Sequence, residues 1–167
     1  MLPLFTSGVV CGLAAAYLSD NSDKANDEVK RPNSETITEI SRYTIPPPAS
    51  NFIPTEEFKM VIGVRTDLKY KLYKTATSLG DVVIKAIKNA VETKNELLSP
   101  WYYYAQAKIC TKVPNLDEML QLIESASKAN VPYVTLTDDE NGEICAIALG
   151  PSYISNIDPI SRHLKLM

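Results

Sequence analysis

The sequence predicts an α/β fold, with a small mixed sheet of about four strands between helices in a three-layer α/β/α arrangement. The main observation is that strand-like and helix-like segments alternate from residue 58 onward. The two longer helical segments are also amphipathic, so each can cover one face of a sheet. The predicted strands span 58–65, 107–113, 132–137 and 144–149, and the predicted helices span about 74–94, 115–129 and 153–158.

The chain before this domain begins with an uncharged stretch over residues 2–18. Seventeen residues is near the short limit of about 17–25 for a membrane span. A cleaved signal peptide is disfavoured because no Lys or Arg precedes Lys24, although this reading and that of a docked helix stay open. We therefore expect a membrane anchor over residues 1–19. Gly8 and Gly12 form a small-xxx-small pair through which two anchors could pack, so a homodimer is among the expected partners.

Residues 20–56 are rich in Asp, Asn, Ser, Lys and Glu and end near three consecutive prolines, Pro46–Pro48. Such a composition buries too little apolar surface to offset the entropy lost on ordering. The prolines favour a locally stiff polyproline II conformation. The sequence thus predicts a disordered linker over 20–56 and a folded domain over 57–167.

Within the domain, a stripe of apolar residues with a period of 3.6 predicts a helix over about 74–94. The next helix is predicted to begin after Asn115, a good N-cap, with Asp117 and Glu118 in the favourable first turn. The aromatic run Trp101–Tyr104 lies between a helix and a strand. It could stack on bases or pack the domain edge, and packing is the preferred interpretation. The apolar stripe of the first helix is Leu79, Val82, Val83, Ala86, Ile87, Ala90 and Val91.

Charge is unevenly distributed along the chain, whose net charge is -3. Residues 58–112 hold ten Lys/Arg against four Asp/Glu, and residues 113–167 hold three against eight. A basic sector suits a polyanionic partner, and a solvated lysine face explains it as well. The three cysteines form no CxxC pair, so a zinc site is not expected. We expect instead that their thiols are reduced and that the domain faces the cytosol.

The first predicted strand runs into a charged turn, where residues 65–69 read Arg-Thr-Asp-Leu-Lys and Lys74 follows on a helix. Open α/β sheets bind ligands at the carboxyl ends of their strands, so this turn is a candidate site. Lys74, Ser78 and Asp81 fall on one helical stripe. The stripe is explained by a solvated face, and a lysine-activated serine nucleophile is the alternative.

Several short motifs follow one another over residues 58–167. They are Arg65-Thr66-Asp67-Leu68, Trp101, Gln106-Ala107-Lys108, Lys112-Val113-Pro114, Asp139, Gly150-Pro151 and His163-Leu164-Lys165-Leu166. In the order and spacing of these motifs, the domain resembles the archaeal/eukaryotic type of peptidyl-tRNA hydrolase. The uncharged start and polar linker are similar to those of the family's mitochondrial, membrane-anchored form, which implies a mitochondrial outer-membrane or cytoplasmic location with the domain facing the cytosol.

The resemblance implies cleavage of the ester between a peptide and its tRNA, with peptidyl-tRNA as partner and no metal or cofactor. Lys74 and Asp139 match the positions implicated in catalysis. Lys74 would stabilise negative charge and Asp139 would orient or activate a water. The resemblance also places Lys69, Lys71 and Lys108 where phosphates of the tRNA could be met.

The chain departs from the family's pattern around this site. Two glycines of the family's turn are replaced by Lys71 and Tyr73, a Gln and a His on the helix by Ser78 and Asp81, and a Thr by Glu143. Glu143 and Asp81 would add negative charge near a site that must accept a phosphodiester. The alternative hypothesis is therefore a catalytically degenerate paralogue that works as a membrane-tethered binding or signalling module.

Overall fold

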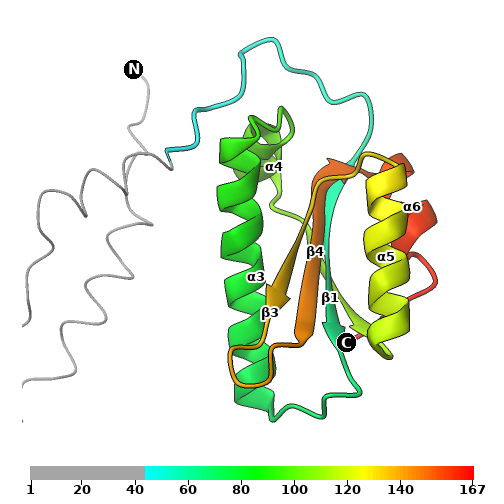
Figure 1. The fold of residues 1–167 in the computed structure, drawn as a ribbon. Coiled ribbons are helices and arrows are strands. Elements are labelled where there is room, and N and C mark those ends of the chain that lie inside the picture. Colours follow the sequence, from blue (N-terminus) through cyan, green and yellow to red (C-terminus); the bar gives the residue numbers. More distant parts are fainter. Residues whose placement is uncertain (1–43) are drawn as a thin grey trace, which may run out of the picture. The chain divides into compact units, whose positions relative to one another are not determined.

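The computed structural model describes residues 44–167, so the predicted anchor over 2–18 and most of the predicted linker lie outside the described residues. In the described part, no helix is both long and apolar enough to cross a membrane. This part forms a mixed sheet with helices on both faces (Figure 1), which confirms the predicted three-layer α/β/α class.

The sheet has five strands in the order β3-β4-β1-β2-β5. β1 and β2 are parallel, and every other neighbouring pair is antiparallel. In chain order the elements are β1 (Phe58–Arg65), α3 (Leu72–Glu92), α4 (Leu98–Tyr104), β2 (Lys108–Val113), α5 (Leu116–Lys128), β3 (Tyr133–Thr137), β4 (Ile144–Tyr153), α6 (Ile154–Ser161) and β5 (Lys165–Leu166).

Two elements differ from the prediction. The expected count of about four strands is wrong by one, because β5 contains only two residues and gives no period that a sequence pattern can reveal. Helix α4 was not expected either, since its seven residues are too few for a clear 3.6-residue period and include Pro100. Proline is tolerated there because it lies in the first turn.

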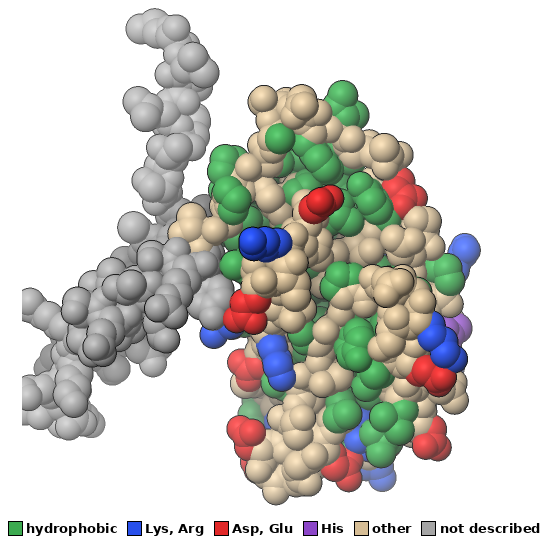
Figure 2. All heavy atoms as spheres, turned by 45° about the horizontal axis from the view of Figure 1, so that its top comes forward, with side chains coloured by type: hydrophobic (Ala, Val, Ile, Leu, Met, Phe, Trp, Pro, Cys, Tyr) green, Lys and Arg blue, Asp and Glu red, His purple; other side chains and the backbone are tan. Residues whose placement is uncertain are grey.

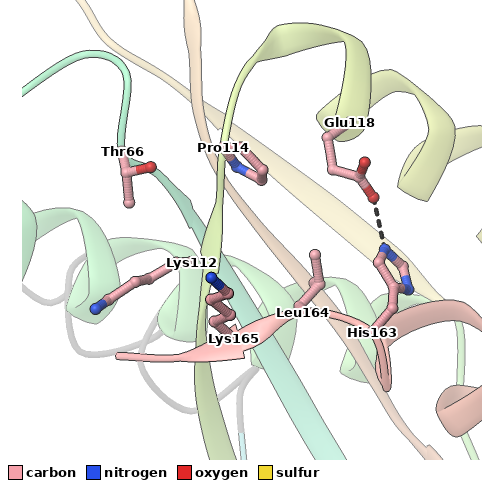
Figure 3. Close-up of a pocket in the computed structure, with 7 residues that line it drawn as sticks. All are labelled: Thr66, Lys112, Pro114, Glu118, His163, Leu164 and Lys165. Atoms are coloured by element: carbon pink, nitrogen blue, oxygen red, sulfur yellow. Dashed lines mark hydrogen bonds and ion pairs between the residues drawn. The ribbon is translucent and has the colours of Figure 1, made fainter.

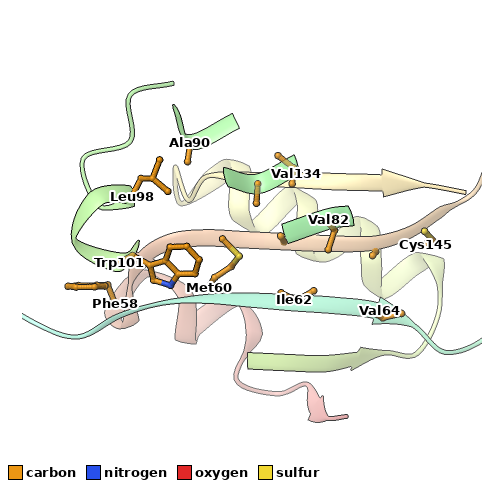
Figure 4. Close-up of a cluster of buried hydrophobic side chains, with 13 residues drawn as sticks. Phe58, Met60, Ile62, Val64, Val82, Ala90, Leu98, Trp101, Val134 and Cys145 are labelled. Atoms are coloured by element: carbon orange, nitrogen blue, oxygen red, sulfur yellow. The ribbon is translucent and has the colours of Figure 1, made fainter. Parts of the chain in front are cut away.

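β1 is buried on both faces, which explains its continuous apolar sequence. Met60, Ile62 and Val64 lie in a cluster with α3 and α4 (Figure 4). Val61, which points to the opposite face, belongs to a second cluster with α5 and α6. Trp101 of α4 closes the first cluster at 1% exposure, so the aromatic run begins in the core as the packing interpretation expects.

The helices follow their sequence signals closely. Buried Val82, Ala86 and Ala90 recur every fourth residue along α3 and form its inner stripe. α5 begins where expected, because the Asn115 side chain accepts a hydrogen bond of 2.9 Å from the Glu118 backbone N–H. Both long helices therefore have their position fixed by local sequence as well as by packing.

The last part of the predicted linker, residues 44–56, contains no helix or strand and contacts α4. The hydroxyls of Ser99 and Tyr103 donate to the carbonyls of Pro46 and Ile45, at 2.6 and 3.0 Å. Phe52 stacks on an α4 tyrosine with ring centres 6.4 Å apart, and it packs against the core together with Ile45. This stretch thus covers part of the domain.

The sheet topology brings three strand ends together. β3 and β1 are both antiparallel to β4, so they run in the same direction, and β2 is parallel to β1. The carboxyl ends at Arg65, Val113 and Thr137 therefore lie at one edge of the sheet, where α3 also begins. Figure 1 shows this edge at the bottom, where the loop from β1 enters α3 and the β3–β4 turn lies beside it.

Candidate functional site

Lys74, in the first turn of α3, lies opposite the turn that joins β3 to β4. Its ammonium group is 2.9 Å from a carboxylate oxygen of Asp138 and 2.7 Å from one of Glu140. The same group lies 4.5 Å above the ring centre of Tyr70. The Tyr70 hydroxyl in turn donates a hydrogen bond to Asp138. Two tertiary contacts therefore hold the Asp138 carboxylate in place.

The electrostatics of this group follow from its contacts. The Tyr70 hydrogen bond, followed by the Lys74 ammonium, lowers the pKa of Asp138 to about 2. Hydrogen bonds to Glu140 and Asp138 raise the pKa of Lys74 above its ordinary value. Burial and the bond to Asp138 raise the pKa of Tyr70. At neutral pH the site thus holds a fixed cation, a fixed carboxylate and a protonated phenol donor.

The two carboxylates that bind Lys74 differ in exposure. The Asp138 side chain is 6% exposed and that of Glu140 is 81% exposed. An exposed carboxylate returns to water at little cost, whereas a buried one that leaves its cation stays in a site with little access to water. A substrate anion can therefore displace Glu140 from Lys74 while Asp138 stays bound.

These residues border a pocket of about 260 Å³. Lys74 and Asp139 both line it, so the predicted pair does meet at one cavity. Among the described residues, however, Asp139 makes no ion pair or side-chain hydrogen bond, whereas its neighbours Asp138 and Glu140 both contact Lys74. The lining residues are Lys74, Thr77, Ser78, Asp81, Leu136, Thr137, Asp138, Asp139, Glu140 and Cys145.

Lys74 is not placed to activate Ser78 as a nucleophile. Its hydroxyl donates to the backbone carbonyl of Lys74 at 2.9 Å, within the same helix. The ammonium is engaged by carboxylates, and the raised pKa of Lys74 keeps it protonated, so it cannot accept a proton from serine. The geometry thus argues against a lysine-activated serine. The expectation of an exposed polar stripe is wrong for Ser78, which is buried at 7% exposure.

Arg65 of the charged turn is a structural residue. It is 5% exposed, and its guanidinium binds both oxygens of Asp67 at 3.0 and 2.6 Å. It also donates to Glu143 at 2.8 Å and to the Ile144 carbonyl at 3.1 Å, which ties β1 to β4. The negative charge of Glu143, expected to burden the site, is thus compensated by Arg65.

The three lysines expected to meet phosphates do not lie together. Lys69 and Lys71 are exposed in the loop between β1 and α3, close in sequence to Lys74. Lys108 is paired in register with Met60, near the start of β1 and thus at the opposite end of the sheet. Its ammonium donates to the Gln106 carbonyl at 2.7 Å and lies 4.9 Å from the centre of the Trp101 ring.

His163, the single histidine, lies away from this pocket. Its Nε2 atom is 2.6 Å from Glu118, a contact between the C-terminal segment and α5. This agrees with the structural role expected from its place in a terminal motif. No group of three or more His, Cys, Asp or Glu side chains within residues 44–167 is arranged to hold a metal ion.

Comparison with known proteins now identifies the domain. Residues 58–167 match the sequence model of the family described as peptidyl-tRNA hydrolase PTH2. The mouse protein named peptidyl-tRNA hydrolase 2, mitochondrial, is 28% identical over 96% of this chain and 88% of its own length. Archaeal peptidyl-tRNA hydrolases from Sulfurisphaera tokodaii and Saccharolobus solfataricus are 34% and 30% identical over 65% of this chain and 98% of theirs. The chain belongs to the archaeal/eukaryotic peptidyl-tRNA hydrolase family.

Proposed function

We propose that this chain hydrolyses the ester bond between a peptide and its tRNA. The observation that carries the proposal is the Lys74–Asp138 ion pair at the mouth of a pocket on the ligand-binding edge of the sheet. Membership of the family and the names of the mouse and archaeal relatives supply the substrate class.

The reaction needs only a water molecule as co-reactant. Its oxygen attacks the ester carbonyl, the bond to the tRNA oxygen breaks, and the proton passes to that leaving oxygen. Lys74 would stabilise the charge that develops on the carbonyl oxygen. We assign the orientation of the water to Asp138. A carboxylate with a pKa of about 2 is a weak base, so its role is to accept a hydrogen bond from the water rather than to remove its proton early.

The test is release of tRNA from a peptidyl-tRNA by the purified full chain. Lys74→Ala should reduce the rate by about 10²–10³, the usual cost of losing one oxyanion donor. Asp138→Asn should impair release strongly. Glu140→Gln is the matched control, because it removes a carboxylate from Lys74 and leaves the bond to Asp138 intact.

Asp139→Asn decides between the two assignments of the carboxylate. If Asp139 carries the role predicted from sequence, its variant will be impaired and that of Asp138 will retain activity. If the unsubstituted chain releases tRNA no faster than buffer alone, the hydrolase proposal itself is contradicted. That result would favour the degenerate binding or signalling module.

We also propose a mitochondrial outer-membrane location, with the domain facing the cytosol. It is supported by the uncharged stretch over residues 2–18 and by the mouse protein, whose name includes its mitochondrial location and whose alignment covers nearly the whole chain. Deleting residues 1–19 should move the protein from the membrane fraction to the soluble fraction. Retention of the shortened chain in membranes would contradict the anchor.

A further inference from the structure

Two lysines lie directly opposite each other on neighbouring strands at the β5 edge of the sheet. Lys112 of β2 and Lys165 of β5 are direct partners in an antiparallel pair. Neither makes a hydrogen bond or ion pair through its side chain within residues 44–167, and both are exposed. Like charges placed directly opposite one another weaken strand pairing, so this arrangement opposes the formation of a strand only two residues long.

The two lysines line a pocket of about 290 Å³ that is separate from the Lys74 site. Figure 3 shows them on one side of this pocket and the Glu118–His163 pair on the other. Glu118 is bound to His163 at 2.6 Å, so the nearest acid in the pocket is already engaged. The pocket thus presents two uncompensated cations, with the Thr66 hydroxyl near them as a polar group.

Most other cations of the domain are engaged. Lys59 and Lys74 are ion-paired, and Lys85 and Lys108 donate to backbone carbonyls. The α4 end, viewed in Figure 2, carries Lys and Arg only as scattered groups among acidic and hydrophobic side chains. Uncompensated cations therefore do not cover the surface evenly.

Four of the six cations in residues 58–167 without a side-chain partner lie at the edge of the sheet where α3 begins, and the other two are Lys94 and Arg162. Lys69 and Lys71 are exposed there and have no side-chain partner among the described residues. The loop that carries them starts beside the end of β2, because the Thr66 N–H donates to the Val113 carbonyl at 2.9 Å. Lys112 immediately precedes Val113. The β2–β5 pair thus continues the line of cations away from the Lys74 pocket.

We propose that Lys112 and Lys165 bind phosphates of an RNA backbone and extend the substrate surface from the Lys74 pocket across the β2–β5 edge. A phosphodiester near both ammonium groups would relieve their mutual repulsion, which no acid of the described chain does. The identification of the RNA as tRNA rests on the proposed function. The binding of a polyanion rests only on the geometry of the two lysines.

The test measures binding of the full chain to uncharged tRNA by fluorescence anisotropy at several salt concentrations. Each lost phosphate contact should reduce the slope of log affinity against log salt by about 0.7–0.9. The double variant Lys112→Gln/Lys165→Gln should therefore lower the affinity and flatten the slope by about 1.4–1.8. The control is Lys94→Gln, an exposed lysine without a side-chain partner in residues 44–167, at the other end of α3; it should bind like the parent.

A single variant separates binding from folding. Lys165→Glu places an acid opposite Lys112, so it should keep or raise the thermal midpoint while it weakens tRNA binding. A double variant with the affinity and slope of the parent would overturn the proposal. If the parent hydrolyses peptidyl-tRNA and the double variant binds tRNA as the parent does, only the assignment of Lys112 and Lys165 is contradicted. If the parent binds tRNA in a salt-dependent way but does not hydrolyse peptidyl-tRNA, only the proposed enzymatic function is contradicted.

Discussion

Tyr70 is the residue that distinguishes Asp138 from an ordinary surface carboxylate. Its hydroxyl supplies the largest effect that lowers the pKa of Asp138, ahead of Lys74. Because the folded-state pKa lies below the ordinary value of 3.8, the bond stabilises the protein above about pH 4. This contribution disappears as pH falls toward 2, where Asp138 becomes protonated.

Tyr70→Phe should therefore raise the pKa of Asp138 and shift the loss of the ionised site to higher pH. The measurement is a carbon-13 NMR titration of the Asp138 carboxyl, with thermal midpoints recorded between pH 7 and 2. The parent and the variant should differ in stability near neutral pH and converge near pH 2. Tyr73→Phe is the control, since Tyr73 is 69% exposed and its hydroxyl has no partner within residues 44–167. Parallel curves at all pH values would show that Tyr70 does not tune Asp138.

The charged turn after the first strand is a local feature, so it identified the end of the sheet where Lys74 lies. Asp139 was predicted from the resemblance to the family, and its catalytic role stays a prediction. Asp138 and Asp139 are adjacent, and nothing local says which faces α3. The bonds from Tyr70 and Lys74, which come from residues more than sixty positions away, decide which side chain is buried.

Among the elements, those predicted well are the ones whose pattern is repeated. α3 and α5 each show several turns of apolar period, and the structure places both within two residues of the predicted limits. β4 continues four residues past its expected end and passes through Gly150-Pro151. β5 exists only through its pairing with β2, which is a tertiary contact.

Alanine substitutions at two glycines test the packing of these elements, and we expect them to change the free energy of unfolding in opposite directions. A methyl group at Gly63 of β1 would lie 2.7 Å from Val113 Cγ2 and 3.0 Å from Ile147 Cγ2. Gly63→Ala should thus cost about 1–3 kcal/mol through overpacking. At Gly80 of α3 no heavy atom lies within 4 Å of the added group, so Gly80→Ala should gain up to about 1 kcal/mol from helix propensity.

Urea unfolding of both variants provides the measurement, with the parent as reference. The two substitutions add the same group, so any general effect of alanine cancels in the comparison. A Gly63→Ala protein as stable as the parent would mean that the sheet and α5 relax around the methyl group at no cost. The close packing of the second apolar cluster would then be refuted.

For the whole molecule, the charge contrast along the sequence is partly cancelled by folding. Lys59, Arg65 and Lys74 from the basic stretch 58–112 pair with Asp158, Glu143 and Asp138 from the acidic stretch 113–167, in addition to their other partners. The net charge of a sequence segment counts these cations as available to a ligand, whereas in the folded sheet their acidic partners lie beside them. The basic sector predicted from sequence is thus smaller than the segment sum suggests, because three of its ten cations have acidic partners from the other segment.

The N-terminal boundary of the stable unit can be tested by truncation. Residues 44–57 contribute Ile45 and Phe52 to the surface of the first apolar cluster and donate no strand or helix. A chain that begins at residue 57 should therefore have a lower thermal midpoint than one that begins at residue 44. Each partly buried apolar side chain removed should cost up to about 1.5–3 kcal/mol.

The matched point variant is Phe52→Ala in the chain that begins at residue 44. It should produce part of the same loss, because it removes the stacking on Tyr104 while the hydrogen bonds to Ile45 and Pro46 remain. Equal midpoints for the chains that begin at 44 and 57 would contradict a stabilising role for this segment. A lower midpoint in both shortened or substituted chains would extend the stable unit beyond the family domain, to residues whose composition alone predicts a disordered linker.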